Sequence, residues 1–185
     1  LAEDEGLRAV VVSGNGRVFC AGHDLKEMLA ADDIRAHRAL FHLCSQVMQA
    51  IVDLPVPVIA KVHGIATAAG CQLVATCDLA VCAEEARFAT PGVQIGLFCS
   101  TPMVALSRNV SRKHAMEMLM SGEIVPAERA AAMGLVNEMV PHGEQHGRAL
   151  ELAHKIASKS SHVVGIGKAA FYRQIDLPLA DAYRY

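Results

Sequence analysis

Three stretches of the chain have the pattern of strands that are buried on both faces. Residues 7–13, 56–62 and 78–83 are almost continuously apolar and rich in β-branched side chains. Each run leads toward a turn, and segments with apolar residues at helical spacing separate the runs. Strands of this kind occur in parallel sheets covered by helices, so the sequence predicts an α/β fold.

The segments between these strands predict helices with definable ends. Residues 34–54 carry apolar side chains at helical spacing and are followed by Pro55 and Pro57, which predicts one long amphipathic helix. Asp24 is a good N-cap for a helix that begins at Leu25. Further helices are expected at residues 111–121, 126–133 and 143–158. A short strand is expected at residues 135–140.

Composition narrows the classes of partner. The chain has 185 residues, of which 52% are apolar and 19% charged, as in one compact domain with a large core. Its formal charge is −2 and its basic residues are scattered, which argues against nucleic acid or a membrane surface as partner. No run approaches the roughly 20 apolar residues of a membrane span. We therefore expect a small-molecule ligand and an intracellular protein.

Six cysteines lie mostly inside apolar runs and lack the CxxC or CxxH spacing of metal sites. We expect buried free thiols in a reducing compartment, and no metal site. They are Cys20, Cys44, Cys71, Cys77, Cys82 and Cys99.

Two predicted helix starts follow strands, one at His23-Asp24 and one at Ala68-Ala69-Gly70. Each can direct unpaired backbone N–H groups and the positive end of a helix dipole outward. If the two starts face each other, they form an oxyanion hole for a carbonyl oxygen. The small residues at 66–70 equally suit close packing of a helix on a sheet, so the residues alone leave both interpretations open.

Residues 19–28 and 63–73, in this order, resemble the two CoA-site segments of the enoyl-CoA hydratase/isomerase (crotonase) family. The resemblance continues through 77–80, 88–91 and 130–136 and so covers nearly the whole chain. It implies an α/β spiral of ββα units and one core domain over residues 1–185, with the N- and C-terminal parts of the family fold missing. Residues 143–185 would then lead into the C-terminal helices through which such proteins form homotrimers or hexamers.

For the site, the resemblance implies that the backbone N–H groups of His23 and Ala69 are the oxyanion donors, with Ala69 where the family usually has glycine. It implies no cofactor beyond the coenzyme A thioester, which is the substrate or ligand. Lys26 is the candidate for contact with the CoA phosphates. The implied substrate-binding residues are Ala21, His23, Asp24, Leu25, Lys26, Ala69 and Gly70.

Hydration in this family relies on two glutamates, and the matching positions here are Gln72 and Gly92. Glutamine cannot ionise and glycine has no side chain, so neither can act as the usual general acid or base, although Gln72 could still orient a water. Two hypotheses remain: an acyl-CoA enzyme with a non-standard acid or base, or a non-catalytic acyl-CoA-binding or regulatory protein of lipid metabolism. Several polar residues near the site in sequence could replace the missing general acid or base, and spacing singles out none of them. They are His23, His63, Asp78, Ser100 and Thr101.

Residues 68–72 and 90–102 resemble one subgroup of the family in which both glutamates are also missing. An α/β-hydrolase is disfavoured because the chain has no G-x-S-x-G elbow, and no G-x-G-x-x-G dinucleotide signature occurs either. The expected compartment is the bacterial cytoplasm, or the mitochondrial matrix if the source is eukaryotic.

Overall fold

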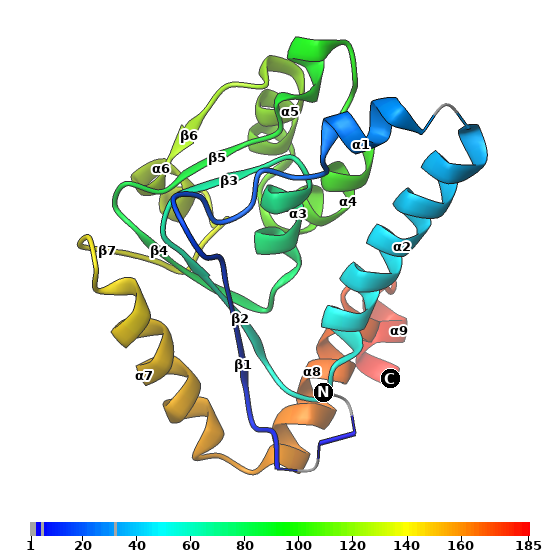
Figure 1. Ribbon diagram of the computed structural model, residues 1–185. Helices are drawn as coiled ribbons and strands as arrows, with labels where there is room; N and C mark the ends of the chain where they lie inside the picture. Colours follow the sequence, from blue (N-terminus) through cyan, green and yellow to red (C-terminus); the bar gives the residue numbers. More distant parts are fainter. Residues whose placement is uncertain (1–2, 5, 32) are drawn as a thin grey trace.

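The computed structural model describes residues 3–4, 6–31 and 33–185 of the chain. Its centre is a parallel sheet in the order β1-β2-β4-β7 (Figure 1). A smaller sheet has the order β3-β5-β6, in which β3 and β5 are parallel and β6 is antiparallel. The strands are β1 (Val10–Ser13), β2 (Val58–Val62), β3 (Ile65–Thr67), β4 (Leu79–Ala83), β5 (Arg87–Ala89), β6 (Val125–Pro126) and β7 (Glu138–Val140).

Successive parts of the chain repeat one pattern: a strand in the large sheet, a strand in the small sheet, then a helix. β2 and β3 lead into α3 (Ala69–Thr76), and β4 and β5 lead into the 3₁₀ turn η1 (Pro91–Ile95) and α4 (Ser100–Asn109). After β1, Cys20 forms a parallel bridge with Ala66 of β3 before α1 (Leu25–Ala30) begins. The chain is therefore a spiral of ββα units, which confirms the predicted fold, and stacking of the units brings the starts of α1 and α3 together.

Helices cover both faces of the large sheet. α7 packs on one face, where Ile59 and Val81 meet Ala149 and Ala153. On the other face Val58 and Ala60 belong to the larger core, which also contains Ile51 of α2. Figure 1 shows α2 running along this side of the molecule, with α8 beside its C-terminal end. The remaining helices are α2 (Ile34–Asp53), α5 (Arg112–Ser121), α6 (Ala127–Ala132), α7 (Gln145–Ala157), α8 (Ser161–Gln174) and α9 (Leu179–Arg184).

The long helix, the three strands and the later helices confirm the sequence prediction, with ends that differ by a few residues. α4 was not predicted, because residues 96–102 have the composition of a loop and Ser100 has the character of an N-cap. In the structure Cys99 holds the N-cap position without a side-chain cap bond. Ser100 is the first helical residue, and Pro102 is tolerated because it lies in the first turn.

All six cysteines are free thiols, as predicted. Four of them are buried, but Cys20 and Cys44 are only half-buried. Burial raises the pKa of Cys71, in the first turn of α3, to about 12, so this thiol stays protonated. Among the described residues, no helix combines the length and apolarity that crossing a bilayer demands.

A buried ion pair attaches α8 to the central sheet. Lys168 Nζ lies 2.7 Å from Asp78 Oδ2 and also donates to the carbonyl oxygens of Ile51 and Val56, at 2.9 and 3.1 Å. The Tyr172 hydroxyl donates to Asp78 Oδ1 at 2.8 Å, and burial together with the Asp78 charge raises the pKa of Tyr172. The Lys168 and Asp78 side chains are only 7% and 14% exposed. Asp78 therefore holds α8 in place.

Candidate active site

Residues 20–22 run along the beginning of α3. Thr67 N–H donates to the Cys20 carbonyl oxygen at 3.0 Å, and Thr67 Oγ1 donates to the Ala21 carbonyl oxygen at 3.2 Å. Gly22 has φ +99°, and a Cβ built on it would lie only 3.3 Å from the Ala69 nitrogen. Because His23 follows Gly22 directly, this packing puts the backbone of His23 next to the N-terminus of α3.

The start of α3 leaves its N–H groups unpaired. Ala69 is the first residue of the helix, and Ala68 at the N-cap offers no side-chain acceptor. Within the part of the chain that the structure describes, no acceptor is found for the N–H of Ala69 or of His23. Both proposed oxyanion donors are therefore free and lie on adjacent segments. α1 differs, because the Asp24 carboxylate accepts from the N–H groups of Lys26 and Glu27, at 2.8 and 3.3 Å.

Ala68, and not Ala69, has the positive φ angle that usually requires glycine. Ala68 has φ +51° and ψ −120°, and among the described residues it alone has a positive φ without being glycine. Its N–H donates to the Ala89 carbonyl oxygen at 3.0 Å, which ties the strained residue to β5. Ala69 itself is helical, so it presents its N–H without backbone strain.

One face of α2 covers both segments. The His23 imidazole meets the Phe41 ring edge-on, with centroids 5.5 Å apart, and the Cys44 thiol lies 4.0 Å from Gln72 Oε1. Phe41 and Cys44 are three residues apart and so share one side of the helix. His23 Nε2 is buried and has no hydrogen-bond partner. The His23 side chain therefore points toward α2 and not toward solvent.

Gln72 and Gly92, the residues expected at the glutamate positions, supply no carboxylate. Gln72 is 5% exposed, in the first turns of α3. Gly92 lies in η1, and its carbonyl oxygen accepts from Leu97 N–H at 2.9 Å. A Cβ at Gly92 would be 2.2 Å from the Leu97 carbonyl oxygen and 2.9 Å from Cys99 Sγ. Since the nearer obstacle is backbone, this turn has no room for any side chain.

Gly92→Ala is therefore expected to lower the free energy of unfolding by about 1–3 kcal/mol, because the added methyl group forces the 92–97 turn to move. Urea unfolding of the full-length protein measures this. Gly147→Ala is the matched control, since Gly147 lies in α7 with open space around it and should gain roughly 0.5–1 kcal/mol. A Gly92→Ala protein as stable as the parent would contradict the packing described for this turn.

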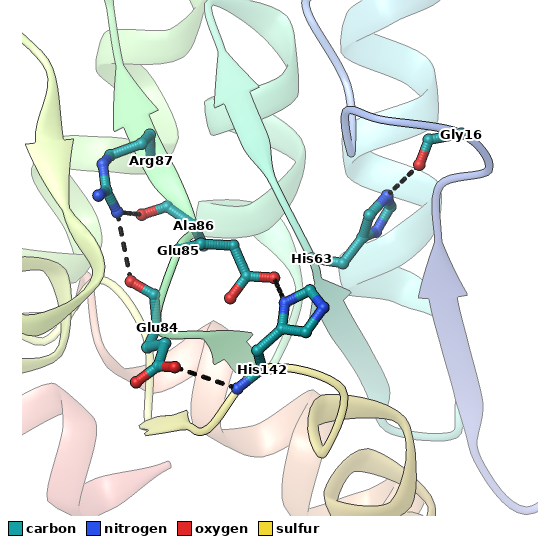
Figure 2. A network of polar contacts seen from close by, with 7 residues as sticks. All are labelled: Gly16, His63, Glu84, Glu85, Ala86, Arg87 and His142. Carbon is teal, nitrogen blue, oxygen red and sulfur yellow. Dashed lines mark hydrogen bonds and ion pairs between the residues drawn. The ribbon is translucent and has the colours of Figure 1, made fainter.

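The other candidate acids and bases make no hydrogen bond to His23 or Gln72 among the described residues. His63 Nε2 contacts the Gly16 carbonyl oxygen at 3.1 Å, at the carboxyl edge of the large sheet, where Figure 2 also shows the Glu85–His142 pair. Ser100 and Thr101 begin α4, which packs against α3, and among the described residues no side-chain hydrogen bond joins them to His23 or Gln72. With Asp78 engaged by Lys168, His23 and Gln72 are the candidates that the structure brings to the two helix starts.

Two hollows lie away from this arrangement. One of about 390 Å³ lies between the end of α2 and α8 and includes Tyr172 and Arg173. Another of about 550 Å³ lies beside β7 and α7. His23, Ala69 and Gln72 line neither of them. In the described portion of the chain, no cluster of three or more His, Cys, Asp or Glu side chains could hold a metal ion.

Comparison with known proteins decides the family. A family model described as "Enoyl-CoA hydratase/isomerase" matches residues 1–185. This chain belongs to the enoyl-CoA hydratase/isomerase family. Among solved structures, an enoyl-CoA hydratase of Mycobacterium smegmatis is 55% identical, with a TM-score of 0.97 over 100% of this chain and 72% of that one. The resemblance of residues 19–28 and 63–73 to this family is thereby confirmed.

Within the enoyl-CoA hydratase/isomerase family, several relatives are named "Enoyl-CoA hydratase domain-containing protein 3, mitochondrial". The rat protein is 50% identical over 182 residues, which are 98% of this chain and 61% of the relative. The crystal structure of human enoyl-CoA hydratase domain-containing protein 3 is 50% identical, with a TM-score of 0.94 over 99% of this chain and 72% of that one. This is the subgroup that residues 68–72 and 90–102 resemble. The chain spans about three-fifths of the length of these curated relatives.

Proposed function

We propose that this protein binds an acyl-CoA thioester and polarises its carbonyl between the N–H groups of His23 and Ala69, in a site without the hydratase acid–base pair. The supporting observation is the packing of Gly22 against the Ala69 nitrogen, which joins two segments whose N–H groups have no other acceptor in the described chain. Membership of the family implies the acyl-CoA ligand. Preorganised donors of this kind stabilise negative charge that develops on a carbonyl oxygen.

The remaining residues proposed to line the ligand passage are Ala21 to Lys26 and Gly70, which adjoin His23 and Ala69 in the sequence. A Cβ at Gly70 would come within 2.0 Å of the Cys20 carbonyl oxygen, so only glycine lets these two segments approach. Lys26 is exposed on α1, and its side chain is available to an anionic group such as a CoA phosphate.

Hydration should be slow at this site. General acids and bases contribute about 100- to 10,000-fold each, and Gln72 and Gly92 supply neither. A non-catalytic acyl-CoA-binding or regulatory role is the second candidate. It is favoured by Gly92, because the turn at this position excludes a side chain and the same hole can hold a carbonyl without turnover.

The test is hydration of crotonyl-CoA by the full-length protein, followed by the absorbance of the conjugated thioester, with butyryl-CoA binding measured by calorimetry. We expect saturable binding and turnover well below about 1 per second, the lower end of ordinary enzymes. Turnover inside the ordinary range would show that another group replaces the glutamates and would exclude the non-catalytic role. Absence of binding would rule out the oxyanion hole.

The family resemblance also leads us to propose an oligomeric state and a cellular compartment for this protein. A homotrimer or hexamer formed through residues 143–185 is supported by apolar side chains that α8 and α9 leave exposed, among them Val163 (67%), Leu179 (74%) and Tyr183 (87%). The relatives named above include mitochondrial and bacterial proteins, which supports the bacterial cytoplasm or the mitochondrial matrix.

A further inference from the structure

The two proposed oxyanion donors are fixed to different degrees. Ala69 is the first residue of α3, so the helix sets the direction of its N–H. His23 lies outside the helices and strands, because α1 begins at Leu25 with Asp24 as its N-cap. No described acceptor takes the His23 N–H, and the preceding Gly22 has φ +99° and no side chain that restricts rotation. The direction of the His23 N–H therefore depends on another constraint.

The His23 side chain makes a contact that supplies this constraint. Its imidazole meets the Phe41 ring edge-on, with an interplanar angle of 88° and centroids 5.5 Å apart. Aromatic pairs with this geometry are favourable beyond the area that they bury. The imidazole nitrogen Nε2 is buried and has no hydrogen-bond partner in the described chain, which is unfavourable in itself. Packing on Phe41, and not a hydrogen bond at Nε2, therefore holds the His23 ring against α2.

The same face of α2 also holds the helix that follows His23. His37 Nε2 lies 2.8 Å from the carbonyl oxygen of Met28, which belongs to α1. His37 and Phe41 are four residues apart and so lie on one side of α2. α2 therefore contacts residues 23–28 at two points, one before the start of α1 and one within it.

We infer that α2 aligns the His23 N–H with the oxyanion hole and that Phe41 is the positioning residue, acting through the His23 ring. This rests on the function proposed above and names the side chain on which the geometry of its hole depends. Oxyanion donors act because they are preorganised, and a displacement of about 1 Å can cost roughly 100-fold in rate. Loss of the Phe41 ring should therefore weaken polarisation of the carbonyl although both N–H groups are still present.

The test measures the infrared stretching frequency of butyryl-CoA labelled with ¹³C at the thioester carbonyl and bound at saturation to the full-length protein. Two aligned donors should give the bound carbonyl a lower frequency than that of free butyryl-CoA. Phe41→Ala should raise the bound frequency and lower any turnover of crotonyl-CoA by about 100-fold. Phe41→Tyr, which keeps a ring, should preserve the parent frequency. Leu43→Ala, which truncates an exposed apolar side chain of α2, is the matched control and should also preserve it.

A double-mutant cycle tests whether Phe41 acts through His23. His23→Ala keeps the backbone N–H but removes the ring, so it should raise the carbonyl frequency as much as Phe41→Ala does. The combination of both substitutions should give no further rise. Additive effects would overturn the inference, because Phe41 would then act on the carbonyl by a route that does not include the His23 ring.

The outcomes separate this inference from the proposed function. If the parent does not bind butyryl-CoA, or binds it without lowering the carbonyl frequency, the oxyanion hole itself fails. If the parent lowers the frequency and Phe41→Ala leaves it unchanged, the role of Phe41 fails while the hole stands. Should Phe41→Ala not fold, as judged by thermal melting, Phe41→Leu takes its place. Leucine keeps an apolar side chain without an aromatic edge, so an unchanged frequency in Phe41→Leu overturns the inference.

Discussion

Removal of the Ala69 N–H is expected to lower any turnover at the thioester carbonyl by about 100- to 1,000-fold, the usual effect of deleting one oxyanion donor. Proline suits this purpose, because Ala69 is the first residue of α3, where a missing N–H and a fixed φ are tolerated. Proline restricts the preceding residue, and Ala68 has φ +51°. The variant is therefore Ala68→Gly with Ala69→Pro, since glycine adopts positive φ readily.

The reference protein for this comparison is Ala68→Gly alone, which keeps the N–H. Crotonyl-CoA hydration gives the rate. The infrared stretching frequency of a ¹³C-labelled thioester carbonyl, measured in the bound state, reports polarisation even where turnover is slow. We expect the frequency to be lower in Ala68→Gly than in the double variant. Equal rates and equal frequencies would exclude Ala69 as an oxyanion donor.

Loss of the Lys168 ammonium group is expected to lower the free energy of unfolding by about 3–5 kcal/mol. Lys168→Met keeps most of the side-chain volume but leaves the Asp78 carboxylate buried without its cation, together with two carbonyl oxygens that Lys168 now satisfies. The cost follows from the uncompensated charge more than from the lost attraction. Urea unfolding of the full-length protein measures the change.

An exposed pair provides the control. Arg184 and Asp181 are 3.0 Å apart on α9, with side chains 78% and 49% exposed, so Arg184→Met should change stability by less than about 1 kcal/mol. Adding Asp78→Asn to Lys168→Met should recover part of the loss, because it removes the unpaired charge. If Lys168→Met is no more destabilising than Arg184→Met, the ion pair does not hold α8 to the sheet.

The order of elements could be predicted from local patterns. The β-branched runs before residues 14, 63 and 84 identified the parallel strands, and α2 was recognisable from its apolar spacing and from the prolines that follow it. β3 and β5 were missed because three residues are too few to show a period. The first turn of α4 was read as a loop, because its serine, threonine and proline are also typical of loops.

The candidate site was predictable in part. The sequence singled out His23, Ala69 and Gln72, and the structure brings the backbone of His23 and the start of α3 together. The sequence could not reveal that Phe41 and Cys44 of α2 contact His23 and Gln72. Cys44 and Gln72 are 28 residues apart in the chain and meet only through packing. Nor could it show that Asp78, a candidate acid, is paired with Lys168, which is 90 residues further along the chain.

By itself, the sequence determined the α/β class, because short-range periodicity acts within a few residues. Its resemblance to the enoyl-CoA hydratase/isomerase family supplied the two segments proposed to carry oxyanion donors and the expectation that Gln72 and Gly92 stand at the hydratase glutamate positions. The tertiary structure decided that the positive φ falls on Ala68, that the turn at Gly92 excludes a side chain, and that Cys44 lies beside Gln72. These properties depend on close contacts between segments that the spiral brings together, and such contacts leave no local pattern in the sequence.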